Sequence, residues 1–158
     1  MKLSRKRWQI VAGVILGGFL LSGCGEKLST EQQIIATLEN MEQAAEQGHH
    51  LEFMTHVADD FSGQLGALNR REFHRFMIFQ MNENRRLQAQ FFPIHVQEKD
   101  DTESATARFK MLVTGGAGLL PERGQLFEVE SGWVRDGSDW LLHSAEWKPV
   151  DMAAVYRQ

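Results

Sequence analysis

The hydrophobic pattern of this chain changes once, near residue 85, and that change limits the possible folds more than any other feature. Before it, apolar residues recur every three or four positions, which is the spacing of helices that bury one face. After it, apolar and polar residues alternate, as in strands that bury one face. Because all the helices precede the strands, the pattern predicts an α+β fold and not a series of βαβ units.

Three helices are predicted in the first half, over residues 30–47, 51–61 and 69–84. The first is expected to begin at Thr30, because Thr30 and Gln33 form a capping-box pattern. Each segment carries its apolar residues along one side. We therefore expect each helix to pack that side against a shared core.

Four strands are predicted after the helices, over residues 87–97, 104–114, 125–135 and 140–148. Pro93 interrupts the first of them, which favours a bulge or an edge position because proline lacks a backbone N–H. Short turn-like segments connect the strands. The simplest arrangement is an antiparallel meander.

A second feature, at the start of the chain, concerns location. Basic residues precede an uncharged apolar run over residues 10–21, which is shorter than the ~20 residues that span a bilayer. The run ends in Leu21-Ser22-Gly23-Cys24, which resembles the lipobox of bacterial lipoproteins. The resemblance implies that residues 1–23 are a cleaved signal peptide, that Cys24 carries lipid, and that residues 24–29 are a tether.

The residue after the lipidation position indicates which membrane holds the protein. Gly25 occupies it, whereas aspartate there is the usual inner-membrane retention signal in the Gram-negative lipoproteins that this segment resembles. The resemblance therefore implies the outer membrane, with the domain facing the periplasm. Contact with the membrane would run through the lipid on Cys24, without a membrane-spanning helix.

The charge and cysteine content of the chain limit which classes of partner and which sources of stability we expect. The chain has a formal net charge of −4, and loss of the basic signal peptide makes the mature part more acidic. An acidic domain repels phosphate backbones, so we expect no nucleic-acid partner. Cys24 is the only cysteine, so core packing rather than a disulfide must stabilise the fold. The mature part has the length of one domain.

The six histidines do not predict a metal site. His49 and His50 are adjacent, so on a helix their side chains diverge by about 100° and cannot readily hold one ion. The sequence contains no His-Glu-x-x-His motif and no pair of cysteines. We therefore expect neither a metal nor another cofactor.

Two segments and the order of elements together carry a resemblance. The segments are Val57–Phe61, at the end of the second predicted helix, and Gly137–Leu142, at the entry to the last strand. With helices first and a long meander after them, residues 30–150 resemble the nuclear transport factor 2-like (NTF2-like) family, also called the cystatin-like cone. The resemblance implies a curved sheet that wraps the helices around an apolar pocket, with residues 151–158 as a tail.

The resemblance does not fix the activity, because the family includes isomerases, dehydratases, ligand binders and protein-interaction modules. The isomerase-like members use a carboxylate base and a tyrosine-centred oxyanion site, which implies Asp59 or Asp60 as the base. The dehydratase-like members use a histidine with an aspartate, which implies His56, His95 or His143 as the histidine. The only tyrosine, Tyr156, lies in the terminal tail, where it does not complete an oxyanion site.

We expect a non-catalytic binding or accessory module of the cell envelope, for a small apolar ligand or for an envelope protein. Its candidate ligand-binding residues are Phe91, His95, Trp133 and Trp147, aromatic or histidine side chains on the strands that would serve the core as well. The alternative is a small isomerase or dehydratase that uses Asp59 or Asp60 with a histidine in the cone. Apolar residues on both faces of the last strand also favour a homodimer through the sheet.

Overall fold

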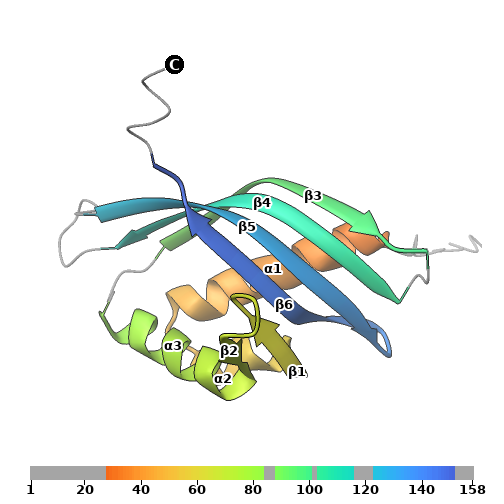
Figure 1. The fold of residues 1–158 in the computed structure, drawn as a ribbon, viewed down its shortest axis with the longest axis horizontal. Helices are drawn as coiled ribbons and strands as arrows, with labels where there is room; N and C mark the ends of the chain where they lie inside the picture. The colour runs from red at the N-terminus through yellow and green to blue at the C-terminus, as the bar shows by residue number, and fades with distance from the viewer. Residues whose placement is uncertain (1–27, 84–87, 101–102, 116–122, 152–158) are drawn as a thin grey trace, which may run out of the picture.

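In the part of the chain that the structure describes, one sheet curves over three helices (Figure 1). The computed structural model describes residues 28–83, 88–100, 103–115 and 123–151. The predicted signal peptide and Cys24 lie outside this part. The helices and strands are α1 (Thr30–Glu46), α2 (His50–Thr55), β1 (Val57–Gly63), β2 (Leu68–Asn69), α3 (Arg70–Glu83), β3 (Gln88–Glu98), β4 (Ser104–Gly115), β5 (Arg123–Asp136) and β6 (Asp139–Pro149). None of the described helices has the length and apolar character needed to cross a membrane.

The sheet has the strand order β2-β1-β6-β5-β4-β3. Strands β3 to β6 form the predicted antiparallel meander, and β1 joins it parallel to β6. The pairing of β3 with β4 shifts between Phe92 and His95, so the bulge predicted from Pro93 is present. A second shift follows Gly132, where any side chain would collide with the Ser144 hydroxyl. These irregularities accompany the bend of the long strands over α1 (Figure 1).

Two local predictions are wrong. Helix α1 is capped one residue earlier than expected, because the Ser29 hydroxyl accepts the Gln32 N–H at 3.2 Å while the Gln32 side chain accepts the Ser29 N–H at 2.9 Å. Residues 57–61, expected to be helical, belong to strand β1. Pairing of Val57 with Leu142 of β6, and of Ser62 and Gly63 with β6 and β2, anchors both ends of this segment as a strand and overrides its helical spacing.

Arg70, at the start of α3, forms hydrogen bonds on both sides of the connection between α2 and β1. Its guanidinium donates to the Met54 carbonyl at 2.9 Å and to the Val57 carbonyl at 3.2 Å. The first carbonyl lies near the end of α2 and the second at the start of β1, so the two flank the turn between these elements. A cation from a later helix therefore stabilises this turn, and no pattern within residues 51–61 could reveal it.

The core lies between the helices and the concave face of the sheet. Its most deeply buried side chains include Ile34 on α1 and Trp133 on β5, which are 0% and 1% exposed. The buried hydrophobic residues of the described chain all fall between Ile34 and Ala145. The buried core of the described residues therefore lies wholly after the predicted lipidation position.

Candidate functional site

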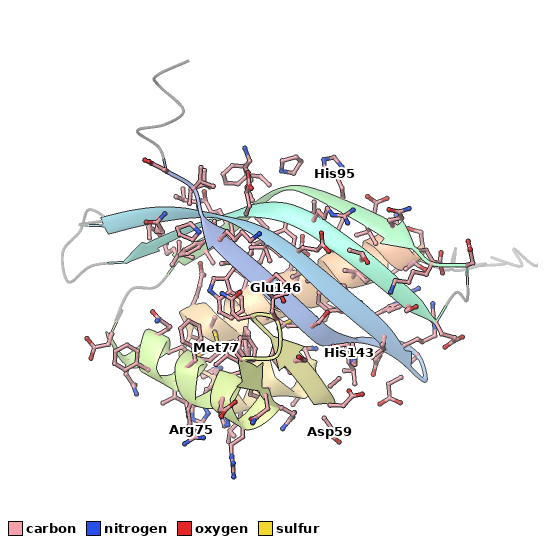
Figure 2. All side chains as sticks on the ribbon, in the orientation of Figure 1. Asp59, Arg75, Met77, His95, His143 and Glu146 are labelled. Atoms are coloured by element: carbon pink, nitrogen blue, oxygen red, sulfur yellow. The ribbon has the colours of Figure 1, made fainter. Side chains whose placement is uncertain are left out.

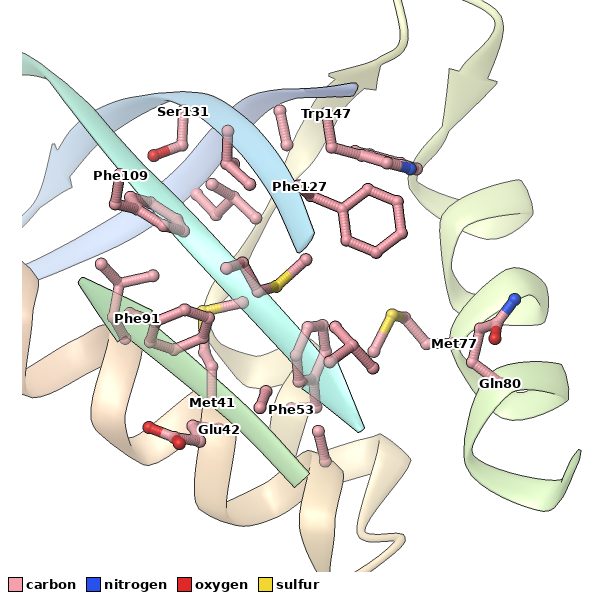
Figure 3. A pocket seen from close by; sticks show the side chains of 18 of the residues that line it. Met41, Glu42, Phe53, Met77, Gln80, Phe91, Phe109, Phe127, Ser131 and Trp147 are labelled. Carbon is pink, nitrogen blue, oxygen red and sulfur yellow. The ribbon is translucent and has the colours of Figure 1, made fainter. Parts of the chain in front are cut away.

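A cavity of about 470 Å³ opens between the helices and the concave face of the sheet (Figure 3). This volume is within the range of small-molecule sites. Helices α1 and α3 and strands β3, β4 and β5 supply most of its wall. The lining residues are Leu38, Met41, Glu42, Ala45, Phe53, Phe73, Phe76, Met77, Gln80, Ala89, Phe91, Phe109, Met111, Val113, Gly115, Gly124, Gln125, Phe127, Val129, Ser131, Leu142, Ala145 and Trp147.

Most of this wall is aromatic, aliphatic or methionine. The Phe91 and Phe109 rings meet edge to face, with centroids 5.2 Å apart, and Phe76 stacks on Trp147 at 5.6 Å. Methionines 41, 77 and 111 lie among these rings, and their flexible thioether chains adapt to ligands of different shape. The wall is therefore suited to an apolar molecule.

Few polar side chains reach the cavity. Ser131 is buried and already engaged, because its hydroxyl donates to the Ala107 carbonyl at 3.2 Å and accepts the Trp133 indole N–H at 2.9 Å. Gln80 enters from α3 and Gln125 from β5. Among the lining residues that the structure describes, only Glu42 is ionisable.

Glu42 lies on α1 next to Met41, at the edge of the apolar wall (Figure 3). Its side chain is half-buried, and burial raises the pKa of its carboxyl above the usual value, helped by repulsion from Glu46 and Glu39. No ion pair to Glu42 forms within the described part of the chain. Among the described lining residues, Glu42 thus supplies the one negative charge, and its surroundings disfavour that charged form.

The four predicted ligand-binding residues divide evenly. Phe91 and Trp147 line the cavity. Trp133 is fully buried behind it, with its indole N–H on Ser131, and is a core residue. His95 is exposed on the opposite face of β3, beyond the bulge at Pro93 (Figure 2).

Trp147 is held in place by the turn after β1. The Gln64 side chain donates to the Trp147 carbonyl at 3.1 Å and accepts the Trp147 N–H at 3.4 Å. Gln64 has a positive φ of 50°, an unusual conformation that this pairing helps to maintain. The turn therefore fixes one aromatic wall of the cavity.

The candidate catalytic residues lie on the outside of the domain, at the junction of β1 and β6 (Figure 2). Asp60 and His143 do meet, with Oδ1 and Nδ1 3.2 Å apart, and Asp59 lies 3.6 Å from the Arg70 guanidinium. The side chains of Asp59, Asp60 and His143 are 102%, 76% and 41% exposed. None of the three lines the cavity.

A histidine pair that the sequence did not reveal joins α2 to α3. The Nδ1 atom of His50 and the Nε2 atom of His74 are 2.9 Å apart, so one ring donates to the other. Burial, and then repulsion from His50 and Arg70, lower the pKa of His74. In the described residues, no three metal-ligating side chains come together, so this contact is a helix–helix hydrogen bond.

Comparison of the sequence with protein-family models and with curated proteins finds no match. Solved structures do match. A proposed dehydratase of the NTF2-like family from Streptomyces avermitilis aligns with a TM-score of 0.65 at 20% identity, over 77% of this chain and 96% of the other. The chain has the NTF2-like fold.

Two further structures have the same architecture. An NTF2-like protein of unknown function from Pseudomonas putida aligns with a TM-score of 0.63 at 18% identity, over 78% of this chain and 89% of its own. Bd1075 of Bdellovibrio bacteriovorus aligns with a TM-score of 0.65 at 10% identity, over 75% of this chain, which covers only 41% of that larger protein. Identities this low establish the fold and leave the function to the site.

Proposed function

We propose that this protein binds a small apolar ligand inside its cone and performs no chemistry on it. The observation that carries the proposal is the cavity of about 470 Å³ with a wall of aromatic, aliphatic and methionine side chains. A wall of this kind binds through burial of apolar surface, worth roughly 25 cal/mol per Å² removed from water. Such a wall has few polar groups that could hold a reacting group in a fixed orientation.

The placement of the candidate acids and bases also favours binding over catalysis. A general base must lie within about 2.6–3.2 Å of the proton that it removes, or reach it through one water. Asp60 and His143 contact each other on the outside of the domain, where β1 lies beside β6, and neither lines the cavity. The isomerase or dehydratase alternative therefore has no support from the residues first considered for it.

We further propose that lipid on Cys24 holds the domain at the periplasmic face of the outer membrane. The support is the Leu21–Cys24 motif and the glycine that follows it. Cys24→Ser should release the domain into the soluble periplasmic fraction, because the thiol that receives the lipid is lost. Fractionation of cells expressing either form measures this. If the variant is processed and still sediments with outer membranes at high salt, anchoring through Cys24 is wrong.

Blocking the cavity tests the binding function. Val113 lines the cavity from β4, and the neighbouring Leu112 does not, because adjacent strand residues face opposite sides. We expect Val113→Trp to weaken binding of the neutral apolar dye Nile red at least about tenfold, equivalent to ~1.4 kcal/mol. Leu112→Trp, which adds the same ring outside the cavity, should leave dye binding unchanged.

The measurement is a fluorescence titration on residues 25–158, which contain every buried hydrophobic residue of the described chain. Equal dye binding by both tryptophan variants and the unmodified domain would contradict a ligand in the cone. The alternative partner, an envelope protein docked on the outside, predicts that equality.

A further inference from the structure

We propose that the ligand of this cavity is a cationic amphiphile, an apolar molecule whose ammonium group pairs with Glu42. This inference rests on the proposed binding function and adds the chemical class of the ligand. It follows from the charge and position of one carboxylate in a wall whose other described side chains are uncharged.

The described lining of the cavity presents a negative charge to a ligand. Glu42 is the one ionisable side chain among the described residues that line it. Glu39 and Glu46 stand one turn away on either side along α1, so they add negative potential at the same edge. No lysine, arginine or histidine appears among the described lining residues. The potential at this edge therefore favours a positive head group.

Glu42 lies at the border between solvent and the apolar wall of the cavity. Its helix neighbours Met41 and Ala45 line the cavity, and Phe91 enters from the facing strand β3 (Figure 3). A ligand whose apolar body fills the space between these walls has its end near the Glu42 carboxylate. An amphiphile is the simplest molecule that has both an apolar body for the cavity and a polar end for the carboxylate.

The state of Glu42 without ligand also bears on the choice of head group. Burial raises the pKa of this carboxyl, which means that the surroundings disfavour its charged form. An ammonium group would compensate that charge and supply hydrogen-bond donors. A hydroxyl would supply a neutral hydrogen bond only, and a second carboxylate would add repulsion. Ammonium, hydroxyl and carboxylate ligands should therefore bind in that order of decreasing affinity.

Three probes with the same alkyl chain isolate the head group: dodecylamine, dodecanol and dodecanoate. Each is titrated against Nile red bound to residues 25–158 at pH 7, the amine and the carboxylate below their micellar concentrations and the alcohol below its solubility limit. We expect dodecylamine to bind about tenfold more tightly than dodecanol, because a hydrogen bond between two charged groups is stronger than one that involves a neutral hydroxyl. Dodecanoate should bind more weakly than dodecanol.

Glu42→Gln keeps the shape of the side chain and removes the charge. In this variant dodecylamine and dodecanol should bind equally, while the affinity for dodecanol stays the same and shows that the cavity is intact. Glu31→Gln is the matched control, since Glu31 is an exposed glutamate in the first turn of the same helix. It should retain the tenfold preference.

The outcomes separate the two proposals. If the unmodified domain binds dodecylamine no better than dodecanol, or if Glu42→Gln keeps the preference, the cationic class is wrong while a cavity that Val113→Trp blocks still stands. If Val113→Trp also leaves dye binding unchanged, the binding function itself fails.

Discussion

Glu42 and Asp60 are both carboxylates on regular elements of one small domain, and they lie in opposite surroundings. Glu42 borders an apolar cavity, where burial raises the pKa of its carboxyl. Asp60 is 76% exposed at the edge of the sheet, where it contacts His143. Of the two, only the half-buried Glu42 lines the cavity, and solvent weakens the electrostatic effect of the exposed Asp60. Position relative to the cavity, rather than residue type, separates the functional candidate from the surface charge.

The same contrast runs through the sheet. Along β4, Ala107 and Phe109 are buried under the helices, while Arg108 and Lys110 point to the exposed convex face. Arg108 pairs with Glu130 at 2.7 Å, yet both side chains are more than half exposed. Exposed pairs of this kind contribute little to stability. The concave face therefore carries the stability as well as the site.

The largest expected effect contrasts these two faces by removing one aromatic ring from each. Trp133→Ala should lower the free energy of unfolding by about 3–5 kcal/mol, because the ring is 1% exposed and its loss leaves a cavity. Phe92→Ala, on the convex face of β3 with 44% of the residue exposed, should lower it by less than about 1 kcal/mol. Urea unfolding followed by tryptophan fluorescence and circular dichroism measures both.

A similar loss from both substitutions would contradict the contrast. It would mean that the convex face is covered in solution, as in the homodimer through the sheet that the last strand also favours. Sedimentation of the unmodified domain would then show a dimer.

The sequence predicted those features that depend on local periodicity. The four strands, the meander and the bulge at Pro93 were expected and are present. Residues 57–61 were not expected to form a strand, because their apolar spacing fits a helix as well, and only pairing with β6 decides between them. Long-range pairing is not encoded in a short window.

The site was predicted less completely. Phe91 and Trp147 were expected at the cavity and lie there, since aromatic residues on the concave face of a curved sheet have few other places. Trp133 follows the same alternation of apolar and polar residues, but it lies deeper, where its indole N–H donates to the Ser131 hydroxyl. Glu42 was missed, because a glutamate at the border of a helical apolar stripe looks like any solvated charge. Its significance depends on the strands that face it.

A smaller effect is expected from Glu42 itself. In the folded protein the pKa of this carboxyl is raised, so protonation stabilises the fold, and that contribution is lost as pH rises through the folded-state pKa. Glu42→Gln mimics the protonated form. It should therefore raise the free energy of unfolding at pH 7, by less than about 1 kcal/mol because solvent screens the half-exposed group. The gain should vanish at pH values below 4.5, the ordinary pKa of a glutamate carboxyl, because Glu42 is then protonated in both the folded and the unfolded state.

Thermal melts of both proteins across this pH range measure the difference. Glu31→Gln serves as the control and should be slightly destabilising at pH 7, because a negative charge in the first turn of α1 favours the helix. If Glu42→Gln is also destabilising at pH 7, the surroundings of Glu42 favour its charge, and the argument for an uncompensated carboxylate fails.

The smallest effects are expected at the edge of the sheet. Asp59→Asn and Asp60→Asn should each change the free energy of unfolding by no more than about 0.5 kcal/mol, because both side chains are largely in solvent. Neither should alter Nile red binding, since neither residue lines the cavity. Complementation of a deletion strain, with protein abundance checked, extends the measurement to function. Normal abundance with complete loss of complementation in the aspartate variants, while Val113→Trp still complements, would reverse the contrast between cavity and edge. The Asp60–His143 pair would then be the working site and the protein an enzyme.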